Sequence, residues 1–437
     1  MADSREHIVQ LARDHFNALE TPAFEPGVTY IPPSGKVMDA EDCAHLVDAA
    51  LDMWLTAGRY ADRFEKDLAT KFGRKLSKLT VSGSAANLLA FTTLTSPKMK
   101  DKRILPGAEV ITVAAGFPTT VAPILQNGCV PVFVDVDVET HNVDVAAVRN
   151  AVTDKTRAIM IAHSLGNPFD VIAIKQICDE HDLFLIEDCC DAFGATVNGR
   201  GVGTFGDMAT LSFYPAHHIT MGEGGAILMD QIRFGRICES FRDWGRDCYC
   251  KPGESNTCNK RFDWQLGDLP QGYDHKYTYS HLGYNLKVSD MQAAVGLSQL
   301  NKLDHFVRRR RENFDLLTTR MKDAGLDKIF HLPRATEGTE PSWFGYLLTI
   351  RDGQGIDRTK LTSRLEELKV GTRLLFGGNL TKQPAFIGTN FRVSGSLEKT
   401  DKLMDDAFWI GVWPGIDNQR VDYMVDTLAK AVREQRP

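Results

Sequence analysis

The chain has 437 residues, of which 43% are hydrophobic and 25% are charged, and its formal net charge is −6. This length predicts a large domain with a smaller one attached, and the mild acidity argues against a nucleic-acid binder, which would carry a basic excess. The first residues contain no apolar signal core, and no apolar run approaches the ~18 residues of a membrane span, so we expect a cytoplasmic protein without a membrane partner.

The N-terminal part is predicted to be helical. Residues 1–20 and 40–57 have the apolar spacing of amphipathic helices, and a connection rich in proline separates them. We assign residues 1–40 to an N-terminal helix and arm that precede the large domain.

Short apolar runs then alternate with helical stretches such as 143–152 and 171–182. The runs have the length and β-branched content of buried strands, and they are 109–113, 131–137, 157–163, 183–188, 209–213 and 226–230. Such alternation predicts an α/β large domain over residues 41–300, with a mostly parallel sheet between helices. Ligands of these sheets bind at the carboxyl ends of the strands.

The last part is predicted to form a smaller α+β domain over residues 301–437. Residues 288–325 are expected to be helical, as one element with a bend, and 346–350 is a predicted strand. The basic run Arg308 to Arg311 lies in a polar helical stretch. We interpret it as a solvated helix face, with a site for an acidic or phosphorylated partner as the alternative.

Four strand-end segments carry polar side chains. They are Ser82-Gly83-Ser84-Ala85-Ala86-Asn87, Glu187-Asp188, the stretch from Ser212 through His217 to Gly225, and the stretch from Gly283 to Ala294. The first opens a helix, whose N–H groups can bind an anion, although taken alone a simple helix cap is favoured. The second closes a buried strand, where a carboxylate is costly unless a cation or hydrogen-bond donors face it.

Together these segments resemble the DegT/DnrJ/EryC1 family of sugar aminotransferases and dehydratases, which have the fold-type I architecture and use pyridoxal phosphate. The order and spacing match over roughly residues 30–300. The resemblance implies that Gly83 and Ser84 form the turn that binds the cofactor phosphate, and that Ser212 is a second phosphate contact.

The same resemblance implies three further roles around the cofactor. Asp188 would pair with the pyridine nitrogen and keep the ring protonated as an electron sink, and Phe117 would stack on the ring. Asn285 would reach the phosphate of the neighbouring subunit, which implies a homodimer with shared sites.

One departure from the family changes the expected chemistry. The family's cofactor-binding lysine lies six residues before the glutamate of a Glu-Gly-Gly segment, and counting back from Glu223 gives His217. An imidazole cannot form the imine that the lysine forms, but it can act as a general base or acid. The resemblance therefore implies non-covalent pyridoxamine 5′-phosphate (PMP) and dehydration in place of amino transfer. The alternative is a structural histidine in an inactive homologue.

Other positions near the expected site also depart from the aminotransferases. Asp191 stands where they tend to have His or Gln, and Phe344 stands where many have His. Both changes suit a site that no longer handles an amino-donor carboxylate. Tyr214 is expected either to orient the substrate or to pack, and His218 is interpreted as structural.

The cysteines suggest a metal or iron–sulfur site in addition to the cofactor site. Cys248, Cys250 and Cys258 lie in a loop-like stretch, for which a cluster or zinc and accidental free thiols are equally favoured by spacing alone. Cys190 precedes Cys248 by 58 positions and is the candidate fourth ligand. We interpret the remaining cysteines as packing residues; they are Cys43, Cys129, Cys178, Cys189 and Cys238.

The intervals of 57, 1 and 7 residues between these four cysteines resemble the iron–sulfur branch of the family. That branch implies a [2Fe–2S] cluster on a loop at 245–275, a CDP-linked 4-keto-6-deoxyhexose as substrate, and C3 dehydration followed by one-electron reductions in 3,6-dideoxyhexose (O-antigen) synthesis. Electrons would come from an NADH-dependent flavin iron–sulfur reductase. The glycines of Gly201-x-Gly203-x-x-Gly206 run into a strand and are predicted to form a turn, because a dinucleotide fingerprint would open a helix.

Two alternatives from the same fold stay open at this point. One is a cluster-free dehydratase that acts on GDP-4-keto-6-deoxymannose. The other is an inactive, partner-binding homologue with zinc in the cysteine loop.

Overall fold

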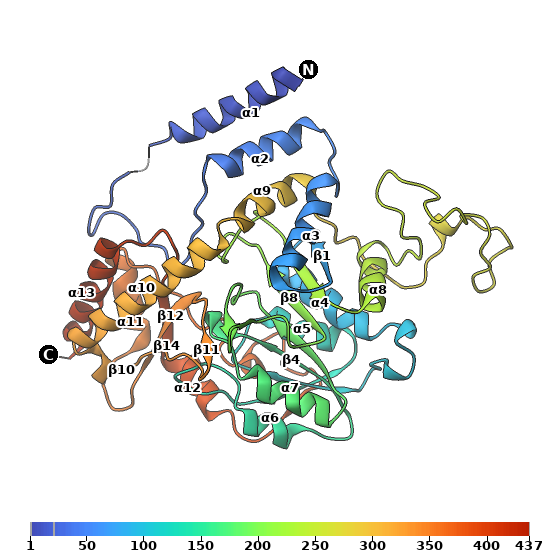
Figure 1. Ribbon diagram of the computed structural model, residues 1–437. Coiled ribbons are helices and arrows are strands. Elements are labelled where there is room, and N and C mark those ends of the chain that lie inside the picture. Colours follow the sequence, from blue (N-terminus) through green and yellow to red (C-terminus); the bar gives the residue numbers. More distant parts are fainter. Residues whose placement is uncertain (1, 21, 437) are drawn as a thin grey trace.

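The protein was analysed as a computed structural model, which describes residues 2–20 and 22–436. A large sheet between helices forms the centre, the C-terminal helices and strands lie beside it, and α1 (Ala2–Asn17) lies outside, against α2 (Ala40–Leu51) (Figure 1). The mostly parallel α/β sheet predicted from the alternating pattern is confirmed, and so is the fold-type I architecture that the family resemblance implied.

The large sheet has eight strands in the order β1-β9-β8-β5-β4-β2-β3-β13. Its strands are β1 (Leu76–Thr80), β2 (Glu109–Val113), β3 (Val130–Val134), β4 (Thr156–Ala162), β5 (Phe184–Asp188), β8 (Met208–Ser212), β9 (Gly225–Met229) and β13 (Arg392–Val393). From β8 to β13 all neighbours are parallel, whereas β9 is antiparallel to both β8 and β1. All six strands predicted from apolar runs are present.

Helices cover both faces of this sheet (Figure 1). They are α3 (Arg59–Phe72), α4 (Gly83–Leu94), α5 (Pro118–Gln126), α6 (Val145–Ala151), α7 (Val171–Glu180), α8 (Ile232–Arg242) and α9 (Asp290–Leu300). Alternate strand residues enter two different apolar clusters, one holding Ile111 and Ile159 and the other Val110 and Ile186. Burial on both faces explains why the strands are continuous apolar runs.

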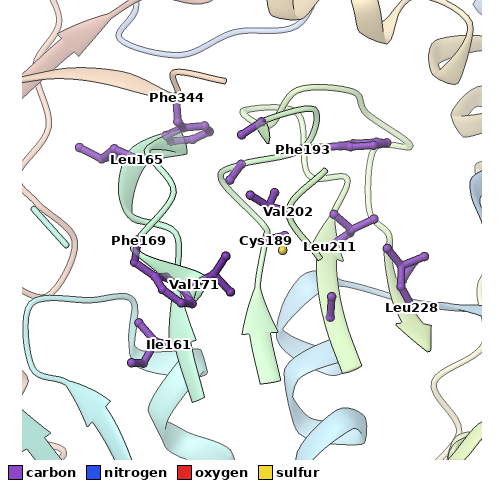
Figure 2. Packing of buried hydrophobic residues seen from close by; sticks show 14 of the residues in the cluster. Ile161, Leu165, Phe169, Val171, Cys189, Phe193, Val202, Leu211, Leu228 and Phe344 are labelled. Atoms are coloured by element: carbon purple, nitrogen blue, oxygen red, sulfur yellow. The ribbon is translucent and has the colours of Figure 1, made fainter. Parts of the chain in front are cut away.

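Figure 2 shows part of the first cluster, in which Cys189 lies among Val202, Leu211 and Phe193. The core role predicted for Cys189 is confirmed. Burial raises the pKa of the Cys129 thiol to about 11 and of the Cys178 and Cys238 thiols to about 12, as packing residues would show.

The C-terminal region is built on the antiparallel strands β10 (Phe330–His331), β12 (Gly345–Ile350) and β14 (Ala407–Gly411). Its helices are α10 (Leu303–Asp323), α11 (Arg358–Glu367), α12 (Glu398–Asp406) and α13 (Asn418–Gln435). The helical stretch expected at 288–325 is interrupted at Asn301 and Lys302, because α9 packs on α2 and α3 while α10 packs on α13. The helix expected at 40–57 ends at Leu51, before the left-handed Met53.

The glycine turn before β8 is confirmed as structural. The carboxylate of Glu187 accepts hydrogen bonds from the backbone N–H groups of Gly203 (2.8 Å), Phe205 (2.9 Å) and Gly206 (2.6 Å). The turn begins at the end of β7 (Arg200–Gly201). This strand pairs with β6 (Thr196–Val197), which also pairs with β11 (Thr339–Glu340). Burial opposes ionisation of Glu187, but the donors and nearby His163 offset it and lower its pKa.

Residues 244–284, here called the arm, extend beyond α8 and away from the sheet (Figure 1). Apart from the short 3₁₀ turn at His275–Tyr277, the arm is irregular. Within residues 2–20 and 22–436, no helix is long and apolar enough to cross a membrane. The domain boundaries predicted at residues 40 and 300 stay predictions.

Candidate active site

A cleft of about 800 Å³ opens at the carboxyl ends of β5 and β8, where the C-terminal region meets the large sheet. Its volume suits a cofactor with a substrate. Ten residues predicted for the site line it: Gly83, Ser84, Phe117, Asp188, Cys190, Asp191, Ser212, Tyr214, His217 and Phe344. Nine of these residues lie at the ends of strands of the large sheet, and Phe344 belongs to the C-terminal region. The structure adds Arg373 and Trp409 from that region.

One end of the cleft is built to receive an anion. Ser82 caps α4 by accepting a hydrogen bond from the Ala85 N–H (3.1 Å), and the first N–H groups of a helix have no intrahelical partner. A Cβ atom at Gly83 would lie 2.4 Å from the Cβ of Ser212, so only glycine allows this approach. Ser84 Oγ contacts Thr119 Oγ1 at 2.9 Å.

A buried carboxylate lies at the base of the cleft. Asp188 Oδ2 accepts hydrogen bonds from Asn87 Nδ2 (2.8 Å) and Thr120 Oγ1 (2.6 Å), and Oδ1 accepts one from the Cys190 N–H (3.1 Å). Asn87 is oriented in turn by the Thr210 hydroxyl at 2.6 Å. The role of Thr120 was missed, although its place just after a predicted strand and Phe117 was a usable signal.

His217 and Asp191 lie side by side above this carboxylate. The Nδ1 atom of His217 is 3.4 Å from Oδ1 of Asp191, and the Phe344 ring packs on the imidazole at 5.2 Å between centroids. Burial lowers the pKa of His217 to about 4, so the imidazole is neutral at neutral pH and able to accept a proton. Burial, together with Asp188, raises the pKa of Asp191 to about 8.

The solvated helix face predicted for Arg308 to Arg311 is wrong for Arg310, which is 1% exposed. Its Nη1 donates to the Trp343 carbonyl (3.1 Å) and its Nη2 to the His217 carbonyl (3.3 Å). These bonds offset part of the desolvation of the guanidinium. The sequence could not show which of four adjacent arginines would face inward.

The remaining cleft residues agree with the sequence in position. Phe117 is 49% exposed and meets Phe376 edge-on at 5.9 Å, while Tyr214 is 51% exposed. Both aromatic rings are therefore free to contact a bound molecule. His218 is buried and its Nε2 bonds the Ser342 carbonyl at 2.8 Å, in agreement with a structural role.

Four predicted site residues lie away from the cleft of their own chain: Asn285, Cys248, Cys250 and Cys258. The Cys250 N–H contacts Cys248 Sγ at 3.5 Å, and Cys250 Sγ contacts Thr257 Oγ1 at 3.1 Å. Among the described residues, the only His, Cys and acidic trio with ligand atoms within 4.8 Å of one another is His163, Glu187 and Cys189. That trio lies at the buried support of the glycine turn.

The chain is similar to known proteins along most of its length. The profile of the DegT/DnrJ/EryC1/StrS aminotransferase family matches residues 36–429. The lipopolysaccharide biosynthesis protein RfbH of Salmonella typhimurium is 54% identical over 422 residues, 96% of either chain. The dTDP-4-dehydro-2,6-dideoxy-D-glucose 3-dehydratase of Saccharopolyspora spinosa is 52% identical over 430 residues, 98% of this chain and 92% of that one. A solved structure of E. coli GDP-4-keto-6-deoxy-D-mannose-3-dehydratase with bound hydrated PLP has a TM-score of 0.82 at 29% identity, covering 92% of this chain and 100% of that chain.

Proposed function

The chain belongs to the DegT/DnrJ/EryC1/StrS aminotransferase family, and we propose that it is a PMP-dependent 3-dehydrase of a nucleotide-linked 4-keto-6-deoxyhexose in deoxysugar synthesis. The observation that carries this proposal is His217, a neutral base held beside Asp191 where the family has its lysine. The names of the two relatives that share more than half of its residues, one in lipopolysaccharide synthesis and one a sugar 3-dehydratase, agree with it.

The residues present fit the cofactor. The N-terminus of α4, with Gly83 and the Ser84 and Ser212 hydroxyls, suits its phosphate, and Asp188 suits a protonated ring nitrogen. When bound, the cofactor supplies an amine that condenses with a ketone and a ring that withdraws electrons. We expect the pyridoxamine form to be held without a covalent bond.

The chain's own residues would then move one proton and exclude water. With Nδ1 facing Asp191, the Nε2 atom of His217 is left to take the proton from C4′ of the cofactor and to protonate the departing C3 hydroxyl. Phe344 and Trp409 cover the imidazole side of the cleft with apolar rings. Tyr214, which lines the cleft and is half-exposed, would orient the sugar.

We further propose that the enzyme is of the iron–sulfur type, with CDP as the nucleotide and an NADH-dependent flavin iron–sulfur reductase as its partner. The support is the spacing of Cys190, Cys248, Cys250 and Cys258. A [2Fe–2S] cluster bound to thiolates carries single electrons. Reduction of the dehydrated sugar to a 3-deoxy product requires electrons. Cys190, Cys248, Cys250 and Cys258 are the residues that would hold this cluster.

A cluster-free dehydratase is the second candidate, because the GDP-4-keto-6-deoxy-D-mannose-3-dehydratase structure shares the fold over 92% of the chain. Protein purified without air distinguishes the two by its iron, zinc and acid-labile sulfide content and by its visible absorption. We expect about two irons per chain, no zinc, and a cofactor that dialysis removes. Colourless, metal-free protein that still dehydrates the sugar would favour the cluster-free enzyme, and zinc without dehydration would favour an inactive homologue.

A further inference from the structure

Residues 373–380, here called the crossing segment, run from the C-terminal region back to the large sheet. At the start of this segment, Arg373 forms an antiparallel bridge with Trp409 of β14. At its end, Asn379 forms a second antiparallel bridge with Ala115, two residues after β2. Backbone pairing therefore holds both ends of the segment, once on the C-terminal sheet and once beside the large sheet.

The middle of the crossing segment has an unfavourable backbone conformation. Phe376 has a φ of 46° and Gly378 a φ of 61°, both in the left-handed region. Glycine adopts this region without steric cost, whereas a residue with a bulky side chain rarely does. The Phe376 N–H donates to the Leu374 carbonyl at 2.7 Å, which closes a very tight turn. Strained residues persist only where their surroundings fix them, and they concentrate at functional sites.

The strained residue lines the cleft and contacts a predicted cofactor residue there. The rings of Phe376 and Phe117 meet edge-on, with centroids 5.9 Å apart and planes at 87°. Phe117 precedes the first turn of α5 and is 49% exposed, so its other neighbours leave about half of it uncovered. Edge-to-face contact is a favoured arrangement of two aromatic rings. The Phe376 ring therefore limits the orientations that the Phe117 ring can adopt.

The backbones that carry the two rings are also joined to each other. The Gly377 N–H donates to the carbonyl of Gly116, the residue before Phe117, at 3.4 Å. The side chain of Gln383 donates in turn to the Gly377 carbonyl, from Nε2 at 2.8 Å. Because these bonds involve no atom of the Phe376 side chain, a substitution at Phe376 changes the ring contact and leaves the backbone connection in place.

We propose that Phe376 is a positioning residue, whose ring holds Phe117 in the orientation in which Phe117 stacks on the cofactor ring. This inference rests on the proposed function, since it takes PMP as the ligand and Phe117 as the stacking residue. It explains why a phenylalanine occupies a left-handed position that glycine would fill without strain. It also explains why a half-exposed ring of the large domain has an edge-on partner from the C-terminal region.

A double-mutant cycle on PMP affinity tests this role. Calorimetry on the cofactor-free full chain gives the Kd of PMP for the wild type, Phe376→Leu, Phe117→Leu and the double variant. An edge-to-face pair contributes roughly a 2- to 10-fold change in affinity, so Phe376→Leu should weaken PMP binding by about this factor. In the Phe117→Leu background the same change should have no further effect, because Phe376 acts through Phe117. Phe376→Tyr keeps the ring and should bind PMP as the wild type does.

The circular dichroism of bound PMP is the second readout, because it depends on how the cofactor ring lies against its neighbours. Phe376→Leu should change this signal, and Phe376→Tyr should restore it. The matched control is Phe386→Leu, shortly after the crossing segment, where the ring is 4% exposed and meets Phe133 edge-on at 6.3 Å. The control should lower the free energy of unfolding in urea and leave PMP affinity unchanged. Phe376→Gly, which accepts the left-handed backbone, replaces Phe376→Leu if that chain is insoluble.

The possible outcomes separate this inference from the proposed function. Equal PMP affinity and dichroism in the wild type and in Phe376→Leu would overturn the positioning role alone. The same loss with and without the Phe117 ring would also overturn it, since Phe376 would then act independently of Phe117. A matching loss of affinity in Phe386→Leu would show that any packing defect in this region is sufficient, with the same consequence. A wild type that binds no PMP would overturn the proposed function, and this inference with it.

Discussion

At the scale of single residues, the first prediction concerns His217 as the general base. His217→Asn keeps a similar shape but cannot accept a proton, so solvent exchange of the C4′ proton should fall by ~10²–10⁴-fold. Cofactor affinity should change little, because Gly83, Ser84, Ser212 and Asp188, which would hold the cofactor, are unchanged. The exchange is followed by NMR on protein loaded with PMP and substrate. Near-normal exchange in this variant would show that another group is the base.

His217→Lys gives the complementary result. A lysine there should bond the cofactor aldehyde covalently, so that borohydride fixes the cofactor to the chain. The wild type should show no such adduct, and one found on a native lysine would contradict non-covalent binding.

The lowered pKa of His217 predicts how C4′ proton exchange and stability depend on pH. A general base works only when neutral, so the acid limb of C4′ exchange should lie near pH 4, below the ordinary histidine value of 6.5. The unfolded chain binds this proton more readily than the folded one, so stability should fall as pH drops from about 6.5 toward 4. NMR titration of the imidazole in the cofactor-free protein measures it, and a value at or above 6.5 would contradict the burial argument.

Arg310 tests whether an inward-facing arginine supports the site. Arg310→Met removes two hydrogen bonds from a charged donor, which should lower the free energy of unfolding by roughly 2–3 kcal/mol. The nearby Arg308 is exposed and contacts His305 Nδ1 at 3.2 Å, and Arg308→Gln should cost less than ~1 kcal/mol. Urea unfolding of both variants gives the comparison, and equal losses would mean that the contacts to the His217 and Trp343 carbonyls add nothing.

At the scale of elements, the sequence predicted the strands well and the breaks between consecutive helices less well. Buried parallel strands carry a strong apolar signal, and β2 (Glu109–Val113) was located to the residue. The break between α9 and α10 has no such signal, because it depends on which helices each one packs against. For the same reason the inward face of α10 could not be read from four consecutive arginines.

The start of α4 gives a prediction at this scale. A methyl group at Gly83→Ala would collide with Ser212, so the helix start must shift and the phosphate site with it. PMP affinity, measured by calorimetry, should fall at least tenfold. The matched control is Gly201→Ala, where a Cβ meets nothing within 4 Å and affinity should be unchanged. Equal affinities in the two variants would show that the anion site is elsewhere.

At the scale of the whole molecule, nine of the ten predicted residues that line the cleft lie at the ends of strands β1, β2, β5 and β8 of the large sheet. Parallel strands end at the same edge, so residues that follow them must meet. On the opposite wall Phe344 was predicted, but Arg373 and Trp409 were not, because the resemblance on which the prediction rested covered roughly residues 30–300. Residues 245–275 were predicted as a loop. The direction of the arm was not predicted, because it depends on long-range contacts at its base: His281 with Ser96 and Ser240, and the backbone bridges Asp243–Asn285 and Arg246–Tyr279.

The two neighbouring acids at the end of β5 have different roles, one structural and one in the cleft. Successive strand residues face opposite sides, so Glu187 holds the glycine turn while Asp188 faces the cleft. A mutant allele that removes Glu187 should therefore be temperature-sensitive, and second-site changes that stabilise the protein should restore it. An allele that removes Asp188 should be inactive at every temperature, and stabilising second-site changes should not restore its activity. A genetic screen would thus separate architecture from chemistry at adjacent codons.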